Sequence, residues 1–355
     1  MKFCLAVLAI VAAGAAGAGV RAGSGDSLVT VTSHPPAVMG TACTLTVVVP
    51  SEKKAAAQEA LAKAEAVLRR VEALMSAHRD GSEVRRLKGA SAMQRVALSP
   101  ETLEVLRTAR HFAEVTGGAF DATAAPLFRL WKRCAALDRL PTQDELAAAR
   151  AVSRWDTLTL FKDGAVKANS RAEVDLGGIA KGYAIDRAVE TMKAAGCVGG
   201  LVDVGGDIRC FGTKPGGRPW RIAVRAPTGP RHAGVLELKS AAVCTSGDYL
   251  RFVQIKGKRY SHIIDPRSGM PVEKTPSVTV IAPDATTADG LATAVSVLGP
   301  TEGLDLVNRL EGVECLLMIR GLAGRSSVLR SAGFPGLVGG GRSACAVRTS
   351  GPTHR

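Results

Sequence analysis

Three segments of the sequence combine glycine with acidic, basic or hydroxyl residues in patterns that a packed core does not need. The first is VDLGGIAKGYAID at 174–186, which predicts a strand ending at Gly177-Gly178 and a helix that begins directly after it. Free N–H groups at such a helix start suit phosphate oxygens, and Lys181 adds a positive charge beside them. A Gly-Gly turn between a strand and a helix is also common without a ligand, so this segment alone leaves both interpretations open.

The second segment is TTADGLATAVSVLGP at 286–300. It predicts a helix with Thr287 as N-cap and an end at Gly299-Pro300. Asp289 and Thr293 then stand at i and i+4, roughly 6 Å apart on one helix face. A carboxylate and a hydroxyl so placed form half of a site for a hard cation such as Mg²⁺, which fills its shell with water and phosphate oxygens. The alternative, which the residues alone favour, is that Asp289 complements the helix dipole and Thr293 packs in the core.

The third segment is split between TSGDYLRF at 245–252 and RYSHIIDPRSGMP at 259–271. A strand here would place His262 and Ile264 on one face and Asp265 on the other. His262 is then either a general acid or base, or a phosphate contact, near neutral pH, or else a hydrogen-bonded core histidine beside a turn at Asp265. The sequence has no G-x-S-x-G elbow, no Walker loop and no G-x-G-x-x-G motif.

The elements that must position these segments mix helices with antiparallel hairpins. Apolar spacing predicts a helix over 52–76, Ser99-Pro100 begins another that stops at Gly117-Gly118, and Thr142-x-x-Glu145 is a capping box. Strands are expected in 27–50 around Pro35-Pro36, in hairpins at Asp163-Gly164 and at 256–258, and further helices over 179–195 and 288–298. The pattern predicts an α+β fold of antiparallel sheets with flanking helices.

Composition limits the alternatives. The 355 residues allow one large domain or two modest ones, and 46 basic against 32 acidic residues give a net charge of +14. The basic residues are scattered without a run of five or six, which favours a phosphate-bearing ligand over nucleic acid. The 39 glycines and 17 prolines show no Gly-X-Y period, which excludes collagen.

The two ends of the chain differ from the rest. Lys2 precedes an apolar run over 3–20 with small residues after it, so residues 1–22 are predicted to be a secretory signal peptide, the alternative being an uncleaved membrane anchor. Residues 338–355 are rich in Gly, Arg and Ser and are expected to be disordered. Seven cysteines follow the leader without a C-x-x-C pair; we expect mainly buried free thiols, with one or two disulfides left open, and no zinc cluster.

Taken together, the motifs resemble the FAD:protein FMN transferase family, also called the ApbE family. Six blocks occur in the order of that family across roughly residues 37–336: GGAFDATAAPLFRLW (117–131), VDLGGIAKGYAID, GLVDVGGDIRCFG (200–212), TSGDYLRF, YSHIIDPRSGMP (260–271) and SVTVIAPDATTADGLATA (277–294). The resemblance implies one family domain over 27–336, built as two closely packed subdomains with FAD in the cleft between them. It also implies Mg²⁺ as cofactor, FAD as substrate, and transfer of FMN to a threonine hydroxyl of a target protein with release of AMP.

The resemblance also assigns residues. FAD contacts would fall on Met39, Ala119, Phe120, Asp121, Asp175, Lys181 and Ile264, and Mg²⁺ on Asp289, Thr293 and a backbone oxygen near Gly178. His262 is the residue expected to handle the acceptor's proton or the leaving phosphate. Where the family has a tyrosine near the flavin, this chain has His78, whose imidazole stacks with less area.

Two other functions share these residues: a pyrophosphatase that releases FMN and AMP, and a non-catalytic periplasmic flavin carrier. The expected acceptor is an exported or membrane redox subunit that bears the threonine, and nucleic acid is not an expected partner. With the leader, the protein is expected to be exported to the periplasm. Contact with the inner membrane is expected only if residues 1–22 stay uncleaved.

Overall fold

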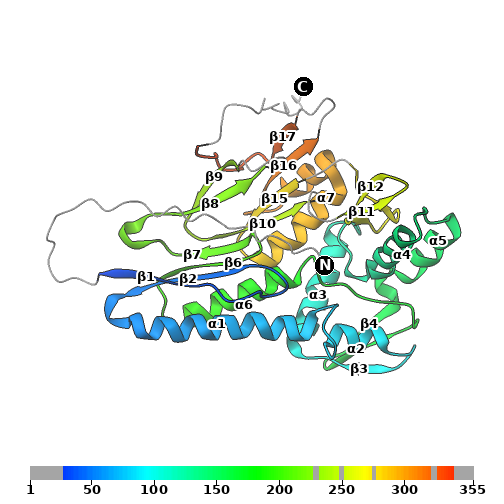
Figure 1. The fold of residues 1–355 in the computed structure, drawn as a ribbon, viewed down its shortest axis with the longest axis horizontal. Helices are drawn as coiled ribbons and strands as arrows, with labels where there is room; N and C mark the ends of the chain where they lie inside the picture. Colours follow the sequence, from blue (N-terminus) through cyan, green and yellow to red (C-terminus); the bar gives the residue numbers. More distant parts are fainter. Residues whose placement is uncertain (1–26, 227–231, 248–251, 274–276, 321–325, 340–355) are drawn as a thin grey trace.

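A large antiparallel sheet forms the centre of the molecule (Figure 1). The computed structural model describes residues 27–226, 232–247, 252–273, 277–320 and 326–339, and within them this sheet has eight strands, each antiparallel to its neighbours. In order across the sheet they are β1 (Leu28–Ser33), β2 (Cys43–Pro50), β6 (Gly199–Val204), β7 (Asp207–Phe211), β10 (Ala241–Gly247), β15 (Ser277–Ala282), β16 (Glu314–Arg320) and β17 (Ser326–Arg330).

Helices α1 (Lys54–Met75), α6 (Ala180–Ala194) and α7 (Ala285–Val307) cover one face of this sheet. The predicted apolar stripe of α1 is confirmed: Leu61, Ala64, Leu68, Val71 and Met75 are all buried. They join the main hydrophobic cluster together with inward-facing residues of the strands and of α6 and α7. The apolar spacing of α1 therefore fixes which side of the helix meets the sheet.

The backbones of α6 and α7 touch at Gly182. A Cβ added there would lie 2.2 Å from the carbonyl oxygen of Ala285 and 2.8 Å from Cα of Thr286. Because any side chain would force the two helices apart, glycine at this position is what lets the start of α7 lie against the first turn of α6.

Smaller units surround this layer. The hairpin β8 (Trp220–Arg225) and β9 (His232–Leu238) packs on the other face of the sheet in a second hydrophobic cluster. Helix α2 (Glu83–Gly89) lies beside a small sheet in the order β3 (Arg95–Ala97), β5 (Gly164–Lys167), β4 (Leu158–Leu160). Helices α4 (Ala125–Ala136) and α5 (Gln143–Val152) pack near the hairpins β11 (Phe252–Ile255) with β12 (Lys258–Ser261) and β13 (Ile264–Asp265) with β14 (Met270–Pro271).

The predicted α+β class with antiparallel sheets and flanking helices is confirmed. Ser99 caps α3 (Pro100–Val115) by accepting a hydrogen bond from the Thr102 N–H, and Thr142 and Glu145 form the capping box of α5. The two strands within 27–50 and the two hairpins are present. Six of the cysteines are buried and free, as expected. The cleft between two subdomains stays a prediction.

Three local predictions are wrong. Residues before Gly177-Gly178 form no strand but an irregular segment that ends in a turn. Helix α7 begins at Ala285 with Asp284, not Thr287, as N-cap, and it resumes beyond a break at Gly299, where φ is 75°. Strand β12 ends at Ser261, and His262 lies exposed in a bend between β12 and β13. The core-histidine alternative for His262 is therefore wrong.

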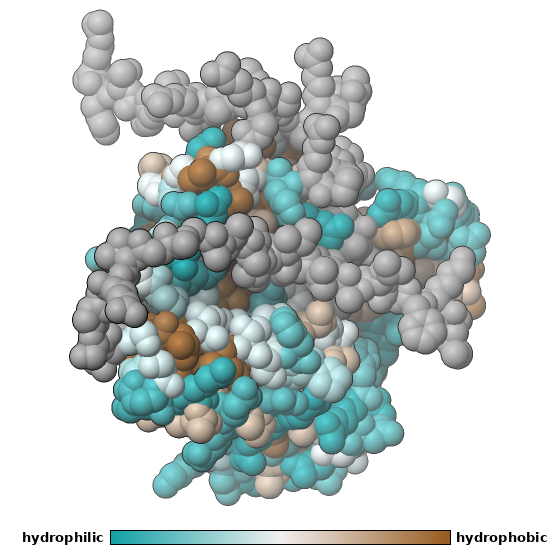
Figure 2. All heavy atoms as spheres, turned by 60° about the vertical axis from the view of Figure 1, so that its left-hand side comes forward, coloured by the Kyte–Doolittle hydropathy of each residue, from teal (hydrophilic) through white to brown (hydrophobic). Residues whose placement is uncertain are grey.

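On the face shown in Figure 2, the described surface is mainly hydrophilic, with small separate apolar patches. No helix in the described ranges is both long and apolar enough to cross a membrane. The predicted signal peptide, most of the predicted tail, and residues 248–251 of the TSGDYLRF block lie outside the described residues.

Candidate functional site

A buried cluster of one lysine and two carboxylates lies where α6, α7 and β7 begin. Lys181, in the first turn of α6, forms a salt bridge with Asp207, the first residue of β7, and its Nζ lies 3.7 Å from Oδ1 of Asp289. Both carboxylate side chains are 6% exposed, whereas the lysine side chain is 30% exposed. Since unpaired charges are costly in such surroundings, the lysine stabilises the acid that it contacts, Asp207.

Asp289 and Thr293 line up on one face of α7, as their spacing predicts. Oδ2 of Asp289 accepts a hydrogen bond of 3.1 Å from the N–H of Gly182, which fixes the carboxylate against α6. The Thr293 hydroxyl lies 3.4 Å from the Ser246 hydroxyl on β10, and a Cβ added to Gly178 would lie 3.0 Å from Thr293 Oγ1. The structure thus brings Gly178, Asp289 and Thr293 together.

These residues fit a hard cation by the chemistry of their donors. A carboxylate, a hydroxyl and nearby backbone are oxygen ligands of the kind that Mg²⁺ takes, with water and phosphate oxygens completing the shell. Among the described residues, no group of three or more His, Cys, Asp or Glu could hold a metal ion. A cation at Asp289 would therefore depend on Thr293, on main-chain oxygen and on oxygens of its ligand.

The AFD block lies directly beside the DLGG segment. The N–H of Asp175 donates to the carbonyl of Ala122, and the Asp175 carboxylate accepts from the N–H of Gly177, both at 2.7 Å. Asp121 accepts from the N–H and hydroxyl of Thr123, and burial raises the pKa of its carboxyl above the ordinary value. The bond from Asp175 to Ala122 joins the two predicted FAD-binding blocks, and the other bonds fix each block locally.

The ring of Phe120 lies beside Gly178 and Thr293, because a Cβ added to Gly178 would be 3.2 Å from this ring. Ala119 and Phe120 are both buried, and the Phe120 ring meets the edge of Phe112 at a centroid distance of 6.0 Å. The predicted residues Phe120, Gly178 and Thr293 therefore come from three distant parts of the chain to one location.

Met39 lies in a tight turn closed by hydrogen bonds between Val38 and Thr41, and its φ is 51°. This turn packs on the turn that leads into β7: a Cβ on Gly205 would lie 2.7 Å from the Thr41 side chain. Gly205 also donates its N–H to the carbonyl of Ala42 at 2.9 Å. The turn that holds Met39 is therefore joined to the strand end that carries Asp207.

Ile264 is buried in a small cluster with Leu127 and Trp131 of α4. The indole N–H of Trp131 donates to the carbonyl of Gly269 at 2.8 Å, which ties the DPRSG turn to that helix. A Cβ on Gly118 would lie 3.6 Å from the Arg267 side chain, so the same turn reaches the AFD block. Ile264 thus belongs to the surroundings of that block.

The two histidines of the prediction are both exposed. His262 follows β12, and His78 follows the end of α1, where its backbone N–H donates to the Ser76 hydroxyl. Their roles in proton transfer and in flavin stacking stay predictions.

Sequence reasoning missed Asp207 and Asp186, although both lie inside the quoted blocks. The buried Asp186 carboxylate accepts from the N–H groups of Ala285 and Thr286, both at 2.8 Å, and from Arg209 at 3.0 Å. Burial raises its pKa although these donors oppose the shift. For Asp207 the available signal was an acid directly after Gly205-Gly206, and for Asp186 it was an acid among apolar residues of a predicted helix.

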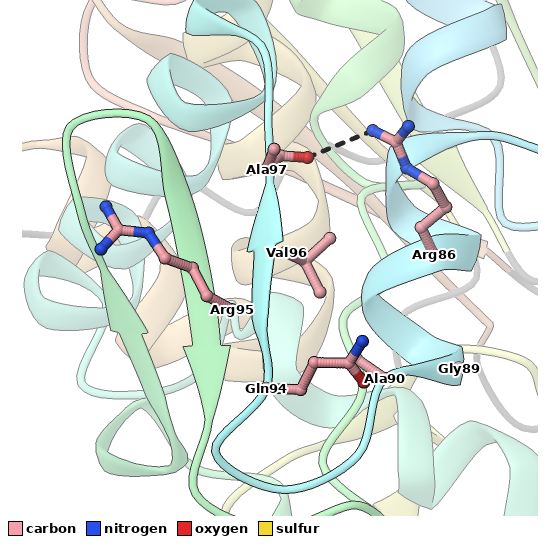
Figure 3. Close-up of a pocket in the computed structure, with 7 residues that line it drawn as sticks. All are labelled: Arg86, Gly89, Ala90, Gln94, Arg95, Val96 and Ala97. Atoms are coloured by element: carbon pink, nitrogen blue, oxygen red, sulfur yellow. Dashed lines mark hydrogen bonds between the residues drawn. The ribbon is translucent and has the colours of Figure 1, made fainter.

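The hollow drawn in Figure 3 lies elsewhere, between α2 and β3, with a volume of about 520 Å³. Arg86 spans it to donate to the carbonyl of Ala97 at 3.1 Å, whereas Arg95 points away on the other side of the strand. None of the predicted site residues lines this hollow. The candidate site is therefore the cluster around Lys181, which lies apart from this hollow.

Comparison with known proteins agrees with this geometry. The model of the ApbE family matches residues 39–317, which include both blocks that meet at Lys181 and Asp289. The chain belongs to the ApbE family. Its members of known structure include the flavin transferase ApbE from Vibrio cholerae, which is 31% identical, with a TM-score of 0.73 over 86% of this chain and 98% of that one.

Other ApbE proteins give the same result. The apo form of the Pseudomonas stutzeri flavinyl transferase ApbE has a TM-score of 0.73 at 32% identity, over 86% of this chain and 95% of that one. A Vibrio cholerae protein named FAD:protein FMN transferase is 37% identical over 67% of this chain and 73% of its own length. A protein of that name from Salmonella typhimurium is 31% identical over 90% of this chain and 93% of its own.

Proposed function

We propose that this enzyme transfers the FMN part of FAD to a threonine hydroxyl of an acceptor protein, with Mg²⁺ bound and AMP released. The observation that carries the proposal is the meeting of Lys181, Asp207 and Asp289 inside the region that matches the ApbE family. The relatives named FAD:protein FMN transferase support flavin transfer to a protein.

In this reaction the acceptor oxygen forms a bond to the phosphorus of the FMN half, and the bond from that phosphorus to the bridging oxygen breaks. AMP leaves with the bridging oxygen, and the hydroxyl proton is lost. Such transfers depend on neutralising and aligning the phosphates more than on covalent help from the protein. Lys181 binds a diphosphate oxygen, and the N–H of Gly178 adds a donor to the same ligand, since the N–H of Gly177 is already held by Asp175.

Asp289, Thr293 and main-chain oxygen near Gly178 would hold Mg²⁺. The ion supplies charge neutralisation for the diphosphate when bound. Phe120 and Met39 form apolar surroundings for the ligand, with Ala119, Asp121, Asp175 and Ile264 as further contacts. His262, which is exposed and stands two residues before Ile264, accepts the proton of the acceptor hydroxyl. His78 stacks on the flavin.

A pyrophosphatase that releases free FMN would use the same residues with water as acceptor. A flavin carrier would bind FAD without cleaving it. We propose further that the protein is exported and acts on an exported or membrane redox subunit, which rests on the apolar run at 3–20.

The test uses protein that begins after residue 22, FAD, and an acceptor domain with an exposed threonine, with Mg²⁺ or with EDTA. AMP is followed by chromatography and the acceptor by intact mass. AMP matched by an FMN-sized mass gain on the acceptor supports the transferase, AMP without that gain supports the pyrophosphatase, and bound FAD without AMP supports the carrier.

Asp289→Ala is expected to abolish turnover and its dependence on Mg²⁺. Asp305→Ala is the matched control, since Asp305 is an exposed acid further along the same helix. Unchanged AMP release by a folded Asp289→Ala protein would contradict the metal assignment.

A further inference from the structure

Asp207 is a buried carboxylate in direct contact with Lys181 that the proposed function leaves without a role. It is the first residue of β7, directly after a Gly-Gly turn in which both glycines have positive φ. Its Oδ2 forms the salt bridge with Lys181, and its Oδ1 accepts a hydrogen bond of 3.1 Å from the N–H of Thr245 on β10. Both oxygens of the carboxylate are therefore occupied within the protein.

The two acids beside Lys181 differ in how closely they hold it. Asp207 is in hydrogen-bond contact with the ammonium, whereas Oδ1 of Asp289 is 3.7 Å away. Asp289 is fixed from the other side, by the N–H of Gly182. Asp207 is thus the hydrogen-bonded partner of the ammonium. Among the described residues, Oδ2 of Asp289 accepts a hydrogen bond from Gly182, whereas its Oδ1 has only the more distant ammonium beside it.

The geometry around Asp289 gives the same assignment. Its Oδ1 stands 3.7 Å from the ammonium, while its Oδ2 is held by the N–H of Gly182. A cation can approach Asp289 without removing the partner of Lys181. An ammonium carries three N–H donors, and one used by Asp207 leaves the others for a ligand.

We propose that Asp207 is a positioning residue that anchors Lys181 to the central sheet, so that the ammonium is aimed at the diphosphate of FAD while Asp289 stays available to a cation. The inference rests on the proposed function. A purely structural ion pair would affect only the stability of the protein. A positioning role predicts instead that removing Asp207 weakens FAD binding, and that it does so only while Lys181 is present.

The experiment measures FAD dissociation constants by flavin fluorescence, in EDTA and in Mg²⁺, together with KM and kcat for AMP release. Asp207→Asn keeps the shape of the side chain but removes its charge, and it is expected to weaken FAD binding about tenfold in EDTA, the size of one charge-assisted hydrogen bond. Asp207→Glu keeps the charge and is expected to recover part of the affinity. Asp203→Asn is the matched control, because Asp203 is a buried acid on the same hairpin that accepts from Gly206.

The single variant Lys181→Met and the double variant Lys181→Met/Asp207→Asn complete a double-mutant cycle with Asp207→Asn. If Asp207 acts through Lys181, the double variant binds FAD no more weakly than Lys181→Met alone. Losses that multiply overturn the inference, as does an Asp207→Asn protein with the wild-type dissociation constant. The double variant carries the test if Asp207→Asn alone does not fold, because it leaves no unpaired lysine.

The two proposals fail in distinguishable ways. Wild-type protein that neither binds FAD nor releases AMP overturns the proposed function. Wild-type protein that does both, with Asp207→Asn and Asp203→Asn indistinguishable from it, overturns only the role of Asp207.

Discussion

Two aspartates hold the beginning of α7, and the structure predicts that their removal has different consequences. Asp284 is the N-cap, and within the described part of the chain its side chain bonds only in its own turn, to the N–H and hydroxyl of Thr287. Asp186 reaches the same helix end from α6 and bonds to Ala285, Thr286 and Arg209. Asp186 is thus a tether between helices, whereas Asp284 is a local cap.

The magnitudes follow from the partners that each variant leaves behind. Asp186→Ala removes the acceptor of two N–H groups and the closest partner of the half-buried Arg209, and it is expected to lower the free energy of unfolding by about 3–5 kcal/mol. Asp284→Ala removes one cap, which costs about 1 kcal/mol. Both acids lie at the same helix N-terminus, so the dipole contribution is similar in the two variants.

Urea unfolding of both variants measures this difference, and titration of AMP release with Mg²⁺ measures its effect on the site. Asp289 lies in the second turn of α7, so loosening the tether is expected to raise the Mg²⁺ concentration for half-maximal rate in Asp186→Ala but not in Asp284→Ala. Asp186→Asn, which keeps one acceptor oxygen, is expected to fall between them. Equal losses of stability in Asp186→Ala and Asp284→Ala would refute the tether.

Three further changes test other parts of the structure. Gly182→Ala places a methyl group against the Ala285 carbonyl and is expected to cost about 1–3 kcal/mol in urea unfolding, whereas Gly89→Ala, with open space around it, is expected to cost nothing. Burial raises the pKa of Asp203 above 3.8 in the folded protein. The folded state therefore holds this proton more tightly than the unfolded state, and wild type loses stability relative to Asp203→Asn as the pH rises from the unfolded pKa through the folded one. A difference in unfolding free energy that is the same at pH ~3 and ~7 would contradict this. All six described cysteines are buried, and in Cys43 and Cys315 burial raises the thiol pKa to about 12. Iodoacetamide is therefore expected to leave the six unlabelled in the native protein, and a labelled peptide from any of them would disagree.

The elements with local signals were predictable from sequence. The long apolar stripe of α1 and the caps at Ser99 and Thr142 depend on residues within one or two turns, and all three are confirmed. Helix α2, of seven residues, and helix α4 were not predicted. Helix α4 begins after the AFD block without a side-chain cap, and its position depends on packing and on the bond from Trp131 to Gly269.

The error at the start of α7 has a physical cause. Thr287 and Asp284 are both acceptable N-caps, and sequence alone does not choose between them. The choice is made by Asp186, almost a hundred residues earlier in the chain, because it accepts the N–H groups of Ala285 and Thr286 and so lets the helix start there. A partner so distant in sequence leaves no trace in the local pattern.

Partners distant in sequence also explain why the spacing of Asp289 and Thr293 was only a weak signal of a site. For the same reason, nothing in the local sequence marked Asp207 as a partner of Lys181. The i and i+4 spacing shows only that two oxygens share a helix face, which is equally true of a solvated helix. What gives Asp289 its surroundings is the close approach of α6 at Gly182, which brings Lys181 within reach. Lys181 in turn meets Asp207 at the start of β7. The site is therefore a consequence of one glycine contact between two helices, and the variant that separates them, Gly182→Ala, is expected to lower both stability and FAD affinity together.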